Sequence, residues 1–526
     1  MLTDLSFLES GEPWPPPSER ARIERYKTNA KLWRGEHQEV LKGWDRLLSA
    51  DVRSSALVEL VLNWHKRIST LWGDLVVGKP PRYLAAAPPD GKFDAAPAVV
   101  PEQQKQIDEI VRRNKLAQVS YKSVIDASRF GDSIIRTRRN AQGLSVVEAL
   151  PPMGWFAIVD PENLQEVMAH VITWEFEVPN DNSYYGIIGP HTKKILRAEI
   201  HARGAIINRA FELQGGKIGY ELNVEEVAPG RRVEEATDSD GFLVVQVSPM
   251  QTTDSVYGID DYTDLETVIH EMEIRLSQNA RILDKHADPS MAGPESVLDQ
   301  DVRTGRQRME AGKFFPVGEG ETTPSYITWD GNLQASFQQI DKLVEMLYVI
   351  SETSPAAFGK LDSGLAQSGS AMKRLLMAPL LKAQRIQGKL DPALTDVMGT
   401  AMKLEGHEMP HPVRIEWKDG LPKDFVELAN SEAVRIGAGL SSVRSSLRRI
   451  DDSTEVELDE EMAAIKADGE QKLEMAAKAA AAGAPQGQAL AGPAGGAGAV
   501  KLPGQKTPAP GSGTKSGGAA NTGYTG

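Results

Sequence analysis

The sequence predicts an α+β protein, and the distribution of patterns along its 526 residues supports this fold class. Helix-like apolar periodicity dominates the N-terminal part, β-rich segments fill residues 133 to 250, and helical periodicity returns at residue 262. Helices and strands grouped in this way, rather than alternating, are typical of α+β domains. The chain exceeds the usual domain size of about 100–200 residues, so we expect two to four structural units.

The first helices are predicted at residues 18–35, 54–77 and 101–130. Gly35 suits the C-terminal cap of the first helix. The second carries apolar residues at three- and four-residue spacing and stops at two prolines, which cannot continue a helix. Residues 82–100 are rich in Ala and Pro and predict a loop.

The β-rich part consists of short segments with β-branched and aromatic residues, separated by Gly, Pro, Asn or Asp, which predicts strands. These segments are residues 133–139, 144–150, 155–159, 166–178, 192–202, 217–227 and 242–247. Residues 413–417 predict a further, lone strand.

Two long helices are predicted at residues 262–286 and 332–353, the first roughly 37 Å long at 1.5 Å per residue. They bracket a turn-rich segment with short strand candidates, so we expect an antiparallel stalk. Each helix carries an apolar stripe, for which we expect packing between subunits. The stripe residues are Leu265, Met272 and Leu276 on the first helix, and Leu333, Ile340 and Val344 on the second.

The C-terminal part begins with a loop of small residues at 354–370. Residues 371–404 predict a long helix that bends, because it contains Pro379 and Gly388. Residues 423–480 are helical and mostly charged. From residue 481 the chain is almost wholly Ala, Gly, Pro, Gln, Ser and Thr, a composition that predicts disorder.

Composition excludes several classes of function. The net charge of −14 argues against a surface that grips phosphates. The absence of cysteine excludes disulfides, thiolate zinc sites, iron–sulfur ligation and cysteine nucleophiles. No basic segment with an apolar run opens the chain, and no window approaches about 18 apolar residues. We expect a protein that is neither exported nor membrane-spanning and that uses no cofactor or metal.

Three motifs invite an enzymatic interpretation. His407, Glu408 and His411 match the H-E-x-x-H zinc pattern, but Pro410 would interrupt the required helix at a cost of about 3 kcal/mol. Residues 364–370 have the outer spacing of a phosphate loop, but Ser370 stands where the lysine is required. The acidic run at 451–461 is typical of a solvated face, although carboxylates there offer ligands for a divalent cation.

The ordered layout resembles the portal protein (head–tail connector) family of tailed bacteriophages. The resemblance is carried by a set of residues that runs from the first helix to the loop at 354–370. They are Tyr26, Leu32, Trp33, Gly35, His37, Asn63, Arg67, residues 75–81, Gly131, residues 160–163, Pro355, Phe358, Gly359 and residues 367–373. The Ser/Gly-rich turn before the long bent helix is the most specific of these. The similarity covers about residues 15 to 470.

The resemblance implies a dodecameric ring at one capsid vertex, with each subunit contributing a defined set of parts. The implied parts are a flexible N-terminal lead (1–14), wing (15–260), stem helix (261–286), clip (287–331), second stem helix (332–353), tunnel loop (354–370), bent helix with wing strand (371–420), crown (421–475) and disordered tail (476–526). The implied location is the virion, after synthesis in the host cytoplasm.

The implied function is that of a structural conduit rather than an enzyme: double-stranded DNA is packaged and ejected through the ring without sequence specificity. The implied partners are the terminase large subunit, the major capsid and scaffolding proteins and a head–tail adaptor, with no membrane. The tunnel loop would face the DNA through Phe358, Lys360, Asp362, Ser363, Gln367 and Ser368. The alternatives are another virion assembly protein, such as an adaptor, a metalloprotease at His407, Glu408 and His411, or a nuclease that uses an acidic cluster.

Overall fold

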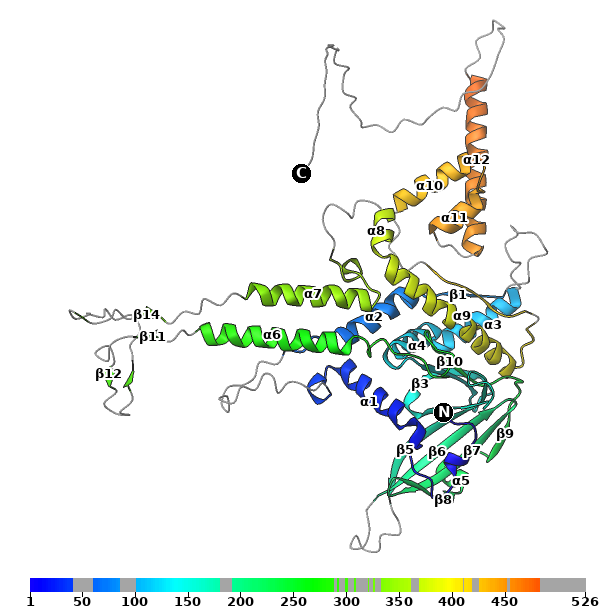
Figure 1. Cartoon of the computed structure of the whole chain (residues 1–526). Helices are drawn as coiled ribbons and strands as arrows, with labels where there is room; N and C mark the ends of the chain where they lie inside the picture. Colours follow the sequence, from blue (N-terminus) through cyan, green and yellow to red (C-terminus); the bar gives the residue numbers. More distant parts are fainter. Residues whose placement is uncertain are drawn as a thin grey trace. The chain divides into compact units, whose positions relative to one another are not determined.

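The computed structural model confirms the α+β fold class and divides the chain into two compact units, Met1–Asp424 and Phe425–Gly526 (Figure 1). The structure describes residues 1–40, 60–85, 101–179, 192–287, 333–360, 369–409, 411–418, 425–451 and 455–482. It also describes short pieces at 291–292, 299–300, 307–308, 320 and 325–326. No helix in these ranges is both long and apolar enough to cross a membrane.

The larger sheet of the first unit is antiparallel and has the strand order β4-β5-β6-β7-β8, with β9 paired to β7. Its strands are β4 (Trp155–Val159), β5 (Val167–Pro179), β6 (Thr192–Ala202), β7 (Ala205–Gln214), β8 (Lys217–Leu222) and β9 (Glu234–Ala236). The sequence patterns missed β7 and β9. The link from β6 to β7 is a two-residue turn of Arg203 and Gly204, and Gly204 has a positive φ of 79°, which glycine adopts without steric cost.

A second, three-stranded sheet has the order β10-β2-β3, with β2 (Ser133–Arg139), β3 (Ser145–Leu150) and β10 (Val244–Val247). Helices α2 (Trp64–Val77), α4 (Leu116–Phe130) and α9 (Met377–Leu404) share one hydrophobic core with this sheet. Trp72 and Leu394 are fully buried in it.

Several predicted elements differ from the observed ones. The helix expected over 101–130 is two helices, α3 (Pro101–Asn114) and α4, because Lys115 between them adopts a left-handed conformation with φ of 49°. The strand expected to stand alone is β15 (Arg414–Glu416). It pairs with β1 (Arg82–Leu84), inside a segment predicted as loop.

The long bent helix is interrupted where a proline requires it. It comprises α8 (Gly369–Leu375) and α9, separated at Leu376. Pro379 has no N–H to donate to the carbonyl of Leu375, and its ring crowds that carbonyl, so the first helix ends there. The predicted bend therefore lies next to Pro379 rather than at Gly388.

The first fifteen residues are packed, which corrects the prediction of a flexible lead at 1–14. Phe7, Leu8 and Trp14 are buried against Phe156 and other side chains on one face of the larger sheet. The same segment pairs with β4 at Leu2 and with β8 at Pro13, so it crosses the sheet from one edge strand to the other. Covering an apolar face and parts of both edges protects the sheet from pairing with other chains.

The second unit contains α10 (Phe425–Gly437), α11 (Val443–Asp451) and α12 (Glu455–Ala482). Glu432 of α10 is buried and accepts hydrogen bonds from Arg449 and Ser446 of α11, which joins the two helices. The hydrogen bonds from Arg449 and Ser446 lower the pKa of Glu432 to about 2. Residues 476–482, predicted as the start of the disordered tail, belong to α12, and the rest of that tail, from 483 onward, lies outside the described residues.

We predict that Trp14→Ala lowers the free energy of unfolding by about 3–5 kcal/mol, the usual cost of truncating a buried aromatic side chain. Trp14 packs near Phe156, and its indole N–H donates to Glu175 Oε1 at 2.7 Å. Urea unfolding followed by tryptophan-independent circular dichroism measures the change. The matched control is Tyr220→Ala on β8, because Tyr220 is 74% exposed. Equal stabilities of the Trp14 and Tyr220 variants would show that the segment is loosely attached.

Candidate functional site: the α6–α7 pair and the segment after it

The two long predicted helices are α6 (Glu266–Ala287) and α7 (Gln334–Ile350), which lie side by side (Figure 1). They run antiparallel: Leu265 and Leu347 share one core at one end, while Ser336 donates a hydrogen bond to Asn279 Oδ1 at 2.8 Å farther along. The segment between the helices contains the paired strands β11 (Met291–Ala292) and β14 (Ser325–Tyr326), and β12 (Asp299–Gln300) and β13 (Gln307–Arg308). The rest of that segment lies outside the described residues.

The apolar stripes of this pair are largely occupied within the chain. Leu265 and Met272 are fully buried in the core of the first unit, and Val344 packs against the same core. Ile340 is buried, whereas Leu276 and Leu333 are half-buried. The chain itself covers Leu265 and Met272, two of the residues predicted to pack between subunits.

A buried His–Glu pair fixes α6 to the N-terminal region. His37 Nδ1 lies 2.6 Å from Glu273 Oε1, and both side chains are fully buried. The same carboxylate oxygen accepts the N–H of Leu62 at 2.9 Å. His65 packs edge-on against His37, and burial, with smaller contributions from the neighbouring His37 and Arg25, lowers the pKa of His65 to about 3. His65 is therefore neutral at neutral pH.

The sequence patterns did not identify this pair. Glu273 is charged, so the apolar stripe predicted for residues 262–286 did not include it. The available signal was its spacing: Glu273 follows Ile269 by four residues and precedes Leu276 by three, which places it on the apolar face.

A series of hydrogen-bonded polar side chains crosses the same core and ends at a buried lysine. Ser69 Oγ lies 2.8 Å from the hydroxyl of Tyr262 and 2.9 Å from Ser128 Oγ. Ser128 donates to Asp261 Oδ2 at 2.6 Å, and Lys382 Nζ donates to Asp261 Oδ1 at 2.8 Å. Burial raises the pKa of Tyr262, so its hydroxyl remains protonated at neutral pH.

Lys382 also reaches the C-terminal end of α7. Its Nζ lies 3.4 Å from the carbonyl oxygen of Ser351, which caps that helix. A cation at a helix C-terminus interacts favourably with the helix dipole. The next residue, Glu352, has a positive φ of 56° and pairs with Arg385 of α9 at 2.6 Å. The end of α7 is therefore held by two cations of α9.

The segment after α7 begins with a short 3-10 helix, Pro355–Phe358. The ring of Phe358 is half-buried and packs edge-on against Trp64 and near Tyr348, with centroid distances of 5.4 and 5.8 Å. The guanidinium of Arg67 lies over the same ring. Lys360 is exposed. The other predicted loop residues, Asp362, Ser363, Gln367 and Ser368, lie outside the described residues.

One side of α7 is not covered by the part of the chain that the structure describes. Met346, Val349 and Ile350 have a spacing that places them on one helical face, and they are 47%, 77% and 42% exposed. Near the start of α9, Met377 and Leu381 are also more than half exposed. Arg385 of that helix pairs with Glu352, so the two exposed sets lie at the same end of α7.

The H-E-x-x-H residues do not form a zinc-binding helix. α9 ends at Leu404, Gly406 has a φ of 78°, and residues 407–409 are not helical. Among the described residues there is no group of three or more His, Cys, Asp or Glu side chains that could hold a metal ion. The phosphate-loop-like segment at 364–368 and part of the acidic run, at 452–454, lie outside the described residues.

Neither a protein-family model nor a curated protein matches this sequence. Among solved structures, the chain is similar to a chain from the "Neck of native GTA particle computed with C12 symmetry". The two are 11% identical, with a TM-score of 0.41, over 84% of this chain and 96% of the other. It is likewise similar to a chain from the "Virion of native gene transfer agent (GTA) particle", with the same identity and TM-score, over 84% and 95%. A likeness at this level does not by itself indicate a function.

We predict that Lys382→Met lowers the free energy of unfolding by about 3–5 kcal/mol, because it leaves the Asp261 carboxylate without its cation in a poorly solvated site. Arg385→Met should cost less than about 1 kcal/mol, since its pair with Glu352 is exposed. Urea unfolding measures both.

The double variant Lys382→Met/Asp261→Asn should lose less unfolding free energy than the single variants Lys382→Met and Asp261→Asn lose together, because residues in contact are coupled. Strict additivity would show that the 2.8 Å contact does not stabilise the protein.

Proposed function

We propose that this chain is a portal-type subunit, which assembles into a ring-shaped channel at one capsid vertex for packaging and ejection of double-stranded DNA. The observation that carries the proposal is the α6–α7 pair. Its base is locked into the core by buried polar contacts, yet α7 keeps Met346, Val349 and Ile350 exposed. Apolar side chains gathered on one face of a helix favour burial against another protein surface.

A second copy of the same chain is the partner that fits this face best. Closed rings form when one surface of a subunit binds a different surface of the next and the rotation closes. The exposed Met377 and Leu381 of α9 offer such a second apolar surface within the same chain. The resemblance of the ordered motifs to portal proteins sets the proposed number of subunits at about twelve.

The order of elements supports the same proposal. An N-terminal region with helices and two sheets is followed by two long antiparallel helices around a small strand-containing segment, then by a short loop, an interrupted long helix and a helical unit. This is the order that the sequence resemblance implies for wing, stem, clip, stem, tunnel loop, bent helix and crown. In this role the chain is not an enzyme, and the terminase would bind it from outside the channel.

We predict that the purified protein forms rings of about twelve subunits, and that Val349→Asp prevents ring formation while the subunit stays folded. The side chain of Val349 is 77% exposed, so a charge there costs little in the monomer but a great deal in an apolar interface. Negative-stain electron microscopy and analytical ultracentrifugation measure assembly, and circular dichroism measures folding.

The matched control is Val233→Asp, since Val233 is 61% exposed and lies in a loop away from α7. Wild-type protein that stays monomeric at every salt concentration, or a Val349→Asp variant that forms normal rings, contradicts the proposal. Rings with a very different subunit number would favour an adaptor over a portal.

We also predict that Lys360→Glu leaves rings intact but reduces packaged DNA, because Lys360 is exposed two residues after the anchored Phe358. A ring of about twelve chains would carry roughly −170 charges, so few cations are available to balance phosphates in the channel. A packaging assay with the terminase measures protected DNA. Lys27→Glu, at an exposed position on α1 (Arg20–Arg34), is the control. Unchanged packaging would mean that Lys360 does not face DNA.

A further inference from the structure

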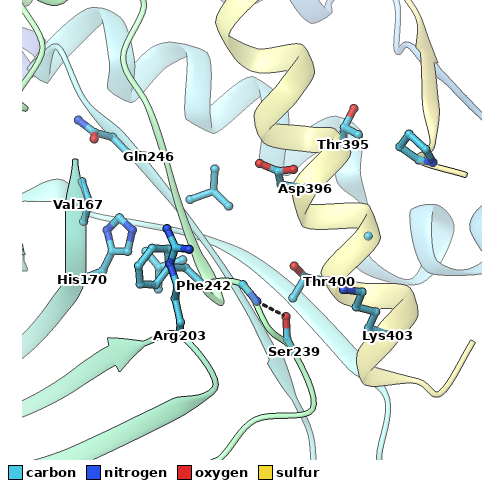
Figure 2. Close-up of a pocket in the computed structure, with 15 residues that line it drawn as sticks. Val167, His170, Arg203, Ser239, Phe242, Gln246, Thr395, Asp396, Thr400 and Lys403 are labelled. Atoms are coloured by element: carbon cyan, nitrogen blue, oxygen red, sulfur yellow. Dashed lines mark hydrogen bonds between the residues drawn. The ribbon is translucent and has the colours of Figure 1, made fainter. Parts of the chain in front are cut away.

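A cavity of about 510 Å³ lies between α9 and the two sheets, away from the α6–α7 pair. Figure 2 shows its two walls: Thr395, Thr400 and Lys403 come from α9, while Arg203 and Phe242 stand opposite. A volume of this size is typical of ligand sites. The proposed channel function does not use this cavity.

The wall formed by α9 contains a glycine that packing does not require. A Cβ atom at Gly399 would meet no other atom within 4 Å, so no close contact demands a glycine there. Glycine inside a helix costs about 1 kcal/mol relative to alanine. What Gly399 does provide is open space, because it lines the cavity and leaves the helix backbone as part of the wall.

Two cations line the cavity without a carboxylate partner. Neither Arg203 nor Lys403 forms an ion pair within the part of the chain that the structure describes, whereas nearby Arg139, Arg197 and Arg231 all do. The guanidinium of Arg203 lies 5.3 Å from the centre of the Phe242 ring, which restrains its position. Both side chains are exposed and lie on opposite walls of the cavity, so in a chain with a net charge of −14 they are suited to an anion bound between them.

A neutral histidine adds a hydrogen-bond donor. His170 lines the cavity, and its Nδ1 accepts the indole N–H of Trp155 at 3.1 Å. Burial lowers the pKa of His170 to about 3, so the neutral ring carries its proton on Nε2. Asp396 is the one acidic side chain among the lining residues, and it can accept a backbone N–H of a bound peptide.

We propose that this cavity binds a carboxylate group, with Arg203 and Lys403 as its charge partners and Gly399 providing the space. The carboxylate comes either from a small dicarboxylic acid or from an acidic side chain on a peptide segment of another protein. Arginine and lysine form charge-assisted hydrogen bonds with carboxylates, about twice as strong as neutral ones. The proposal is independent of ring formation.

Isothermal titration calorimetry of the full-length protein tests the proposal with three probes: glutarate, a capped Gly-Glu-Gly peptide, and glutaramide as the neutral analogue of glutarate. We expect at least one of the acids to bind and glutaramide not to bind. Binding of glutarate alone indicates a small-molecule ligand, and tighter binding of the peptide indicates a protein partner. If neither acid binds, or glutaramide binds equally well, the proposal is wrong.

Two pairs of matched variants locate the binding site. Gly399→Leu should abolish binding, while Gly388→Leu, on the same helix and also with no atom within 4 Å of a new Cβ, should not. Lys403→Gln should weaken binding at least tenfold, while Lys389→Gln, exposed on α9 outside the cavity, should leave it unchanged. Circular dichroism establishes that each variant is folded. Equal binding within both pairs would place the carboxylate elsewhere and overturn the proposal.

Discussion

The ion pair between Lys382 and Asp261 is the interaction on which the arrangement of the first unit depends most. Lys382 comes from α9, Asp261 lies just before α6, and the same ammonium contacts the carbonyl of Ser351, which caps α7. One buried cation therefore holds both helices of the pair at their common base. A buried lysine without a carboxylate would be costly, so α9 and the start of α6 cannot separate without a large loss of free energy.

With its base fixed by the Lys382–Asp261 pair, the α6–α7 pair has two faces with different roles. The inner face, with Leu265 and Met272, is part of the chain's own core, and the His37–Glu273 pair adds a directional contact that apolar packing lacks. The outer face of α7, with Val349, is exposed among the described residues. Because the base is fixed by charge and hydrogen bonds, a partner on the outer face would bind a preformed surface, which lowers the entropic cost of association.

The sequence predicted the fold class, most helices, and strands β2 to β6, β8, β10 and β15, because these follow from apolar periodicity and turn residues. It missed β7 and the packed N-terminal segment, whose structure depends on partners far away in the chain: Phe7, Leu8 and Trp14 are buried only because the sheet face at Phe156 is available. The candidate site was predicted only in outline. Phe358 could be placed at the start of a loop, but its contacts with Trp64 and Tyr348 could not be derived from spacing.

Helix α9 shows how tertiary packing overrides local preference. It contains Gly388 and Pro392, which in isolation would cost about 1 and 3 kcal/mol. Yet the helix continues, because Leu390, Leu394, Val397 and Met398 next to them are fully buried, and each apolar side chain stabilises by about 1.5–3 kcal/mol. The free energy gained by burying these side chains exceeds the cost of the glycine and the proline. The N-terminal end of α9, with Lys382, and its C-terminal end, with Gly399 and Lys403, are therefore held against the same core. Helix α9 therefore both fixes the base of the α6–α7 pair and forms one wall of the cavity.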